Sequence, residues 1–199
     1  MNMKKLYTLM GAALIAGSAS AQVYFGKDFE DQDITTGGCT TQLVTGSLDW
    51  FADVWSGNNF AKMSNYDGQN NLSESWYITP GIDLSGATSP IFSFSTAASN
   101  HAGDDIEIYT STDYDGTSDP NTQGTWNLIT APISAGSYAW TNSGEIAVTN
   151  TSTTTYFAFK YIGSATDGKT WEVDSIFVAE AGEPFDVTAV SYTHLRAHE

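Results

Sequence analysis

Residues 156–178 read YFAFKYIGSATDGKTWEVDSIFV, and the spacing of large apolar side chains in this stretch predicts the fold. In its first half, Phe157, Phe159 and Tyr161 alternate with Tyr156, Ala158, Lys160 and Ile162. In its second half, Trp171, Val173, Ser175 and Phe177 alternate with Glu172, Asp174, Ile176 and Val178. A period of two is typical of β-strands, and strands with one apolar and one mixed face pack sheet against sheet.

Similar short runs recur along the chain, separated by clusters of Gly, Asn, Asp, Ser and Pro. They predict strands at residues 22–29, 42–45, 60–63, 76–78, 90–96, 105–112, 126–129, 144–148, 155–162 and 171–178. Long polar loops are expected at 50–59, 64–75, 113–125 and 163–170. About ten short strands predict an all-β fold, a jelly-roll-like antiparallel β-sandwich over residues 22–178.

The first 21 residues have the pattern of a secretory signal peptide. Lys4 and Lys5 precede an uncharged apolar run at 6–17, and the small residues Ala19 and Ala21 fit signal peptidase. The apolar run is shorter than the roughly 20 residues that a membrane span needs. We therefore expect cleavage after Ala21 and no membrane insertion.

The other end of the chain departs from the composition of the rest. Residues 179–188 are small, acidic and contain Pro184, which predicts a linker to a further region. Residues 189–199, AVSYTHLRAHE, resemble a translated sequencing adapter rather than protein, and an ordinary disordered tail is the alternative. We expect further domains of the same chain to be missing after this point.

Between residues 22 and 189 the chain is strongly acidic. Removing Lys4, Lys5 and Arg196 from seven basic residues, and Glu199 from 23 acidic ones, leaves four and 22, a net charge of −18. Such a surface repels phosphate backbones and anionic lipids, so nucleic acid and membrane surfaces are excluded as partners. Divalent cations are favoured, although the charge also serves solubility alone.

A search for catalytic groups finds little. The only cysteine is Cys39, and the only histidine between residues 22 and 189 is His101. A pairing of Cys39 with His101 as nucleophile and base is conceivable, but no neighbouring sequence activates either. Zinc, serine-hydrolase and phosphate-binding motifs are also absent from the sequence. We expect the chain not to be an enzyme.

Calcium is the metal that the acidic loops favour, because it binds carboxylate, amide and backbone oxygens. One candidate loop contains Asp113, Asp115 and Asp119 in the run DYDGTSDP. A second candidate set combines Glu30 and Asp31 with Asp174, since the first and last strands of jelly rolls are often neighbours. Ordinary turn formation and solvated edge acids are the respective alternatives.

Tryptophans in predicted loops are candidates for sugar binding, because a flat ring stacks on the apolar face of a pyranose. Trp50 and Trp55 lie in the run DWFADVWSGNN, and Trp140 lies in another loop. Packing over the edge of the sandwich is the alternative for each of them.

Five blocks together resemble the choice-of-anchor J domain, a group similar to the cleaved adhesin domains of secreted bacterial proteases. They are FED at 29–31, ESWYITPGIDL at 74–84, DIEIYTSTDYDG at 105–116, WNLI at 126–129 and the stretch at 156–178. The resemblance implies a non-catalytic jelly roll, secreted from or displayed on gram-negative bacteria. It also implies structural calcium near Glu30 and Asp174, although the chain lacks the DGDG run of some relatives.

These observations lead to two hypotheses of different classes. The first is a non-catalytic extracellular binding or adhesion module, carbohydrate-directed and calcium-stabilised, whose partner is a glycan or a host or matrix protein. The second is a structural or accessory domain of a larger secreted protease, nuclease or other enzyme.

Overall fold

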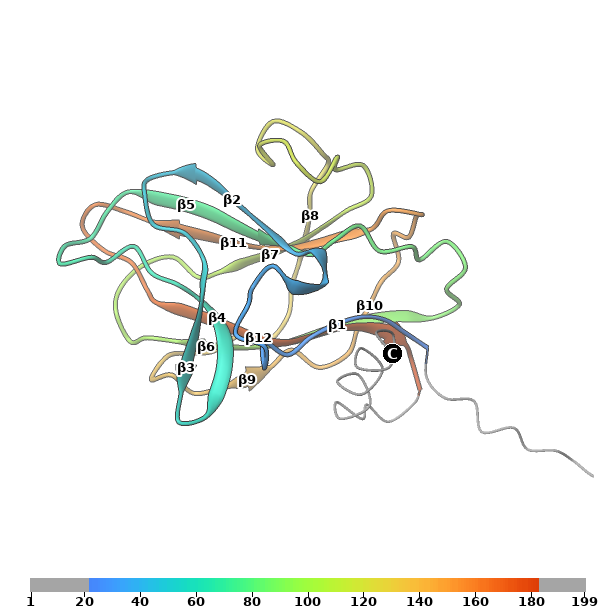
Figure 1. Cartoon of the computed structure of the whole chain (residues 1–199), viewed down its shortest axis with the longest axis horizontal. Coiled ribbons are helices and arrows are strands. Elements are labelled where there is room, and N and C mark those ends of the chain that lie inside the picture. The colour runs from blue at the N-terminus through green and yellow to red at the C-terminus, as the bar shows by residue number, and fades with distance from the viewer. Residues whose placement is uncertain (1–21, 183–199) are drawn as a thin grey trace, which may run out of the picture.

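Large apolar side chains on two long strands meet across the middle of the molecule. The strands are β6 (Pro90–Ala98) and β11 (Tyr156–Gly163), and they belong to different sheets. In this computed structural model, which describes residues 22–182, the two sheets form an antiparallel β-sandwich (Figure 1). The predicted fold class is therefore confirmed.

The seven-stranded sheet runs β10-β6-β12-β4-β3, with β1 paired to β12 and β9 paired to β6. Its strands besides β6 are β1 (Val23–Lys27), β3 (Phe51–Trp55), β4 (Asn58–Met63), β9 (Thr141–Asn142), β10 (Ile146–Ala147) and β12 (Trp171–Glu180). The five-stranded sheet runs β2-β5-β11-β7-β8. Its strands besides β11 are β2 (Thr40–Thr45), β5 (Ser73–Ile78), β7 (Glu107–Ser111) and β8 (Asn127–Ile129). A short 3₁₀ helix, η1 (Thr36–Gly38), precedes β2.

The core between the sheets is largely aromatic. Phe92 of β6 stacks on Phe157 of β11 with ring centroids 4.2 Å apart, and Phe94 meets Phe159 edge-on at 5.1 Å. All four rings are fully buried. Such pairs add roughly 0.5–1.5 kcal/mol each beyond the burial of their surface. The predicted alternation in residues 156–162 is confirmed, because Phe157, Phe159 and Tyr161 all face the core.

A second apolar cluster covers the outer face of the five-stranded sheet. Trp76 and Ala158 face outward there and pack with Tyr114, Tyr109 and Trp126. Tyr114 and Trp126 bracket the long loop between β7 and β8, which projects over this face (Figure 1). This loop therefore closes an aromatic layer that would otherwise be exposed.

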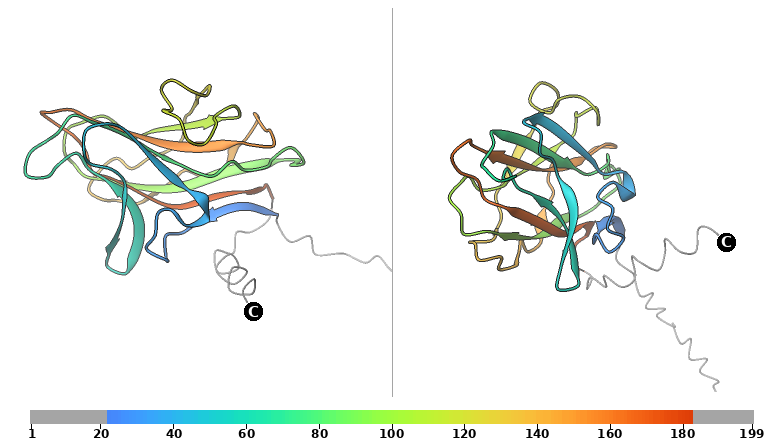
Figure 2. Two further views of the ribbon diagram at one scale, coloured as in Figure 1. Left: turned by 45° about the horizontal axis from the view of Figure 1, so that its top comes forward. Right: turned by 60° about the vertical axis from the view of Figure 1, so that its left-hand side comes forward.

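Two local expectations were wrong. Residues 50–59 are not a loop: β3, the turn after it and the start of β4 lie there. The two strands form a hairpin that extends beyond the body of the sandwich (Figure 2). In β12 the pairing with β6 shifts between Asp174 and Phe177, and Ser175 has a positive φ of 52°. This bulge turns Ile176 and Val178 into the core in place of Ser175 and Phe177.

The first and last strands are neighbours, as expected for a jelly roll. β1 pairs with the second half of β12, and the amide of Glu180 donates to the carbonyl of Gln22 at 3.0 Å. Ala179 and Glu180, expected in the linker, belong to β12. The predicted signal peptide at 1–21, the linker after residue 182 and the adapter-like tail at 189–199 lie outside the described residues.

Phe159→Ala tests the role of the aromatic core. Removing a buried phenylalanine leaves a cavity, so the free energy of unfolding should fall by about 3–5 kcal/mol. The control is Leu128→Ala, because Leu128 is 62% exposed and exposed substitutions change stability by only about 0.5 kcal/mol. Urea denaturation of both variants measures the difference. Equal losses in the two variants would contradict this account of the core.

Candidate functional site

A groove of about 830 Å³ lies on the outer face of the seven-stranded sheet, where β3, β4 and β12 approach the loop before β9. We call it the aromatic groove. It is lined by Asp53, Trp55, Ser56, Asn58, Phe60, Lys62, Ser137, Tyr138, Trp140 and Glu172. Its volume falls within the roughly 300–1,000 Å³ that is usual for ligand sites.

Strand register explains why these side chains share one face. Directly paired residues project to the same side, and Trp55 pairs with Asn58, Asp53 with Phe60 and Phe51 with Lys62. On β4, Ala61 and Met63 have the opposite orientation and face the core. The groove floor is therefore formed by the alternate residues of β4 whose side chains face outward.

Trp55 is carried by the tip of the β3–β4 hairpin. Ser56 and Gly57 form the two-residue turn, with φ values of 53° and 85°. Two successive positive φ values are typical of the type I′ turns that connect tight hairpins, and glycine accepts this conformation without strain. Trp55 is 76% exposed, so its ring is available to a ligand.

Trp140 also lines the groove. Its ring lies 5.7 Å from that of Phe60, which is only 1% exposed and supports it from below. The preceding loop is tied to the end of β6, because Asn100 accepts from the Ser137 amide at 2.5 Å and Tyr138 donates to the Ala98 carbonyl at 2.7 Å. Trp140 is thus presented on a backbone that is held by hydrogen bonds.

Charged groups occupy the floor. Lys62 forms an ion pair with Asp53 at 2.8 Å, and its ammonium lies 5.9 Å from the centroid of the Phe51 ring. Glu172 is 7% exposed. Burial raises the pKa of Glu172, while Lys62 works against the rise and the Asp53 carboxylate adds to it. The floor therefore combines one paired and one mostly buried carboxylate.

Of the three tryptophans predicted to bind a ligand, two meet in this groove and one does not. Trp55 and Trp140 both line it. Trp50 is 4% exposed, packs against Tyr77 and donates its indole N–H to the Ser75 carbonyl at 3.3 Å. The packing alternative therefore describes Trp50.

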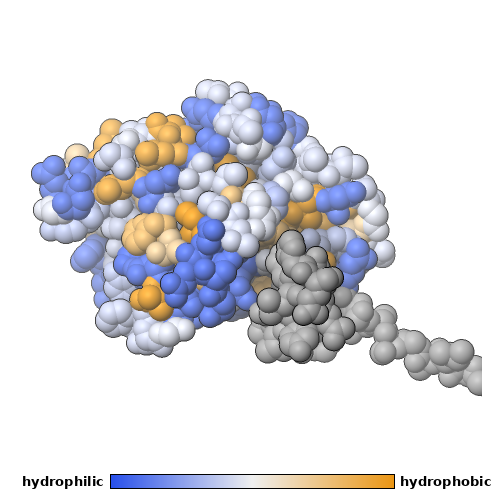
Figure 3. All heavy atoms as spheres, in the orientation of Figure 1, coloured by the Kyte–Doolittle hydropathy of each residue, from blue (hydrophilic) through white to orange (hydrophobic). Residues whose placement is uncertain are grey.

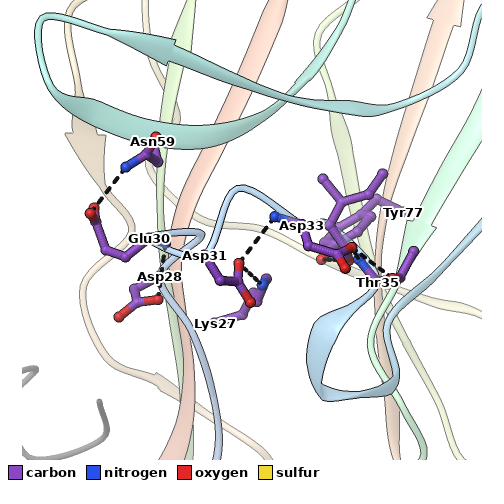
Figure 4. Close-up of polar contacts among 9 residues, drawn as sticks. Lys27, Asp28, Glu30, Asp31, Asp33, Thr35, Asn59 and Tyr77 are labelled. Carbon is purple, nitrogen blue, oxygen red and sulfur yellow. Dashed lines mark hydrogen bonds and ion pairs between the residues drawn. The ribbon is translucent and has the colours of Figure 1, made fainter.

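In the acidic loop after β1, Glu30 and Asp31, both predicted to bind calcium, have different partners. Phe29, at a φ of 57°, is buried against Tyr77, so Asp28 and Glu30 point outward. Glu30 accepts from the Asn59 amide at 3.0 Å, whereas Asp31 pairs with Lys27 at 2.7 Å (Figure 4). Partial burial would raise the pKa of Asp31, but hydrogen bonds from Lys27, the Asp33 amide and Thr36, together with the charge of Lys27, lower it.

Asp174 lies near the first part of this loop. Its pKa is raised to about 6, first by burial and further by the charges of Glu30 and Asp28, while Ser175 and Asn58 oppose the rise. The structure thus brings Glu30 and Asp174 within electrostatic reach of each other. It does not bring Asp31 to them, because Asp31 is held by Lys27. The surface around this loop is hydrophilic, beside hydrophobic groups on the β3–β4 hairpin (Figure 3).

We tested whether these residues suit a calcium ion. No group of three or more His, Cys, Asp or Glu side chains in residues 22–182 is arranged to hold a metal. Calcium, however, also accepts amide and carbonyl oxygens. Asn59 is 7% exposed, and its Oδ1 is buried without a hydrogen-bond partner among the described residues. Glu30 and Asp174 carry carboxylates that repel each other, and Asn59, which contacts Glu30, has an unsatisfied amide oxygen. These are oxygen ligands of the kind that calcium binds.

The second candidate loop uses its carboxylates locally. Asp115 accepts from the amides of Thr117 and Ser118 at 2.9 and 2.8 Å, and hydrogen bonds led by that of the Ser118 hydroxyl lower its pKa to about 2. Asp113 accepts from the Thr125 amide at 2.6 Å, and Asp119 from the Asn121 amide at 2.9 Å. Each carboxylate stabilises a different turn, so the turn alternative accounts for all three.

The Cys39 and His101 pair has no geometric support. Cys39 is 2% exposed, and burial raises its pKa to about 11, which opposes formation of a reactive thiolate. Tyr77, Lys27 and Asp31 are the groups that influence it. His101 is exposed in the connection between β6 and β7.

Among the solved structures that share the fold are three cleaved adhesin domains of Lys-gingipain. The K3 domain, from Porphyromonas gingivalis, is 16% identical, with 81% of this chain and 100% of that domain covered and a TM-score of 0.56. The K1 domain, from the same organism, is 17% identical, with 79% and 98% covered and a TM-score of 0.52. The K2 domain is 15% identical, with 79% and 98% covered and a TM-score of 0.53.

At these identities the likeness concerns the fold alone. It confirms the similarity to cleaved adhesin domains at that level, while the choice-of-anchor J assignment stays a prediction. No known family profile matches the sequence, and no curated protein sequence matches it. Among residues 22–182, no helix has the length and apolar character to cross a membrane.

Sequence reasoning missed the groove residues that are not tryptophans, among them Phe60, Lys62, Tyr138 and Glu172. The Ser56-Gly57 pair between two strand-like runs was a usable hairpin signal. With that hairpin in register, Phe60 and Lys62 follow on the same face as Trp55. Nothing local marks Tyr138 or Glu172 as their neighbours.

Asp174→Asn tests the burial of this carboxyl in metal-free protein. The unfolded group loses its proton near pH 4 and the folded one near 6, so ionisation of Asp174 should cost stability as the pH rises between these values. The variant avoids this cost. Its free energy of unfolding should match wild type at pH 4 and exceed it by up to about 3 kcal/mol at pH 7.

Urea denaturation in EDTA at pH 4, 5, 6 and 7 measures this difference. A constant difference between variant and wild type across the four pH values would show that Asp174 titrates normally in the folded state.

Proposed function

We propose that this chain is a non-catalytic extracellular binding module whose aromatic groove holds a glycan. One observation carries the proposal: Trp55 and Trp140, 85 positions apart in the sequence, line the same groove. Isolated exposed apolar residues are common on protein surfaces. Two exposed tryptophans that line one hollow are the arrangement that a ligand site needs.

The chemistry of the groove suits a sugar chain. Sugars combine apolar ring faces with a rim of hydroxyl groups. Trp55, Trp140 and Tyr138 offer exposed aromatic surface, and Asp53, Asn58 and Glu172 offer hydrogen-bonding groups beside it. Pockets with aromatic walls and a few placed polar groups are typical of small-molecule sites.

Several features support binding without catalysis. The only cysteine is buried, and its pKa is raised rather than lowered. The groove lining contains no histidine, and one of its two carboxylates, that of Asp53, is paired with Lys62. Export through the predicted signal peptide at 1–21 would place the module outside the cytoplasm, where glycans or matrix proteins are the available partners.

Affinity electrophoresis of residues 22–182 in gels containing soluble polysaccharides tests the proposal. At least one polysaccharide should retard the wild type, and Trp55→Ala or Trp140→Ala should weaken that retardation about ten-fold, because each stacked ring is worth roughly 1.4 kcal/mol. Tyr66→Ala is the control, since Tyr66 is 63% exposed and lies outside the groove lining.

Failure of every polysaccharide to retard the wild type would contradict glycan binding. It would favour the alternative role of an accessory domain in a larger secreted protein. Equal weakening by the Tyr66 and tryptophan variants would show that retention does not depend on the groove.

We also propose that calcium stabilises the fold between the acidic loop and β12. Glu30, Asp174 and the Asn59 amide oxygen would hold the ion. It would supply positive charge to two carboxylates that form no ion pair within residues 22–182. Asp31 would act indirectly, since Lys27 holds it in the loop. This ion would lie outside the groove lining and would have a structural role.

Calcium should raise the melting temperature at pH 7, and EDTA should reverse the rise. Saturation at about 100 times the Kd stabilises by about 2.7 kcal/mol, or roughly 5–10 °C for a domain of this size. Asp174→Asn should remove this rise, whereas Asp119→Asn should retain it. Loss of the rise in Asp119→Asn alone would place the ion in the β7–β8 loop instead.

A further inference from the structure

Glu172 is a mostly buried carboxylate on the floor of the aromatic groove. Trp171 and Val173 face the core, so Glu172 between them faces outward. It pairs with Lys62 on β4 and with Ala97 on β6, and it is 7% exposed. Glu172 lies in the middle of a sheet face that the groove leaves partly open. The groove is therefore the route by which its carboxylate reaches solvent.

The chain does not satisfy this carboxylate. Lys62, the cation opposite, directs its ammonium to Asp53 at 2.8 Å. Ala97 has no polar side-chain atom. Within residues 22–182, neither a hydrogen bond nor an ion pair reaches Glu172. Mostly buried polar groups normally have partners, and an ionised carboxylate can only accept hydrogen bonds.

We propose that Glu172 is the specificity-determining residue of the groove, and that it selects uncharged glycans by accepting hydrogen bonds from their hydroxyl groups. The inference rests on the proposed glycan-binding function and deepens it. A sugar hydroxyl between the two tryptophans supplies the donor that the chain lacks. A uronate carboxylate or a sulfate at the same position offers only acceptors and a second negative charge.

The rest of the groove strengthens this selection. Asp53 adds a second carboxylate, and the one cation, Lys62, is already paired with it. The whole chain carries a net charge of −16, which disfavours polyanions at longer range. Long-range repulsion weakens in salt, whereas the contact with the mostly buried Glu172 is screened much less. Salt therefore separates the two contributions.

Matched pairs of polymers test the inference. Hydroxyethylcellulose with carboxymethylcellulose, and galactan with polygalacturonate, differ mainly in charge. Affinity electrophoresis in 0.15 M NaCl should show binding to the neutral member of a pair at least about ten-fold tighter than to the anionic member. This comparison uses the wild-type protein and does not depend on a variant that folds.

Glu172→Gln then isolates the residue. The glutamine amide keeps the shape of the side chain, loses its charge and can donate a hydrogen bond. Binding of the neutral polymer should therefore weaken a few-fold, and the preference for the neutral over the anionic polymer should fall about ten-fold. Glu145→Gln is the matched control, because it removes the same charge from an exposed residue outside the groove lining. Its preference should equal that of wild type.

The outcomes separate the two proposals. Equal binding of neutral and anionic polymers, lost in Trp55→Ala, would overturn the inference and leave the glycan function standing. An unchanged preference in Glu172→Gln, or an equal change in Glu145→Gln, would also overturn it. If neither polymer of either pair binds while a lysine-rich peptide does, a basic protein ligand replaces both proposals.

Discussion

The stacked contact between Phe92 and Phe157 joins the two sheets, and the positions of the other elements depend on it. The rings lie 4.2 Å apart, with Phe94 and Phe159 in edge contact beside them. Side chains alternate across a strand, so burying these rings determines which residues face outward. Where β12 and β6 border the groove, the outward residues Glu172 and Asp174 are acidic, and their partners Ala97 and Ser95 are small. The inner contact therefore determines the chemistry of the outer face as well.

The two sheets use their outer faces differently. The five-stranded sheet covers its outward aromatic residues with the β7–β8 loop, whose Tyr114 and Trp126 complete a second cluster. The seven-stranded sheet leaves its outward residues between a hairpin and the loop before β9, and the aromatic groove results. Aromatic residues are abundant on both outer faces. The two tryptophans that are most exposed among the described residues, Trp55 and Trp140, both belong to the second arrangement.

The sequence predicted much of this fold because its strands alternate clearly. The alternation of Phe157 and Phe159 with their neighbours predicted that they share one face, and the adjacency of the first and last strands followed from the fold class. Ser175 was missed because a serine at positive φ carries no sequence signal, and the resulting bulge exchanges the faces of the residues after it. The groove could be predicted only in part. Trp55 and Trp140 were identified as candidates, but their meeting with Glu172 depends on the register of β3, β4 and β12.

The pairing of β1 with β12 brings both exits of the described domain to one corner. Val23 lies opposite Ala179 there, and the pair ends inside the sheet at Lys27 and Ile176. Tension applied through both exits would open this ladder one rung at a time, as a zipper opens, rather than load all its hydrogen bonds together. Glu172 lies beyond the last rung, on the half of β12 that is paired with β4. Mechanical strain on a tethered chain would therefore reach the groove only after β1 had separated from β12.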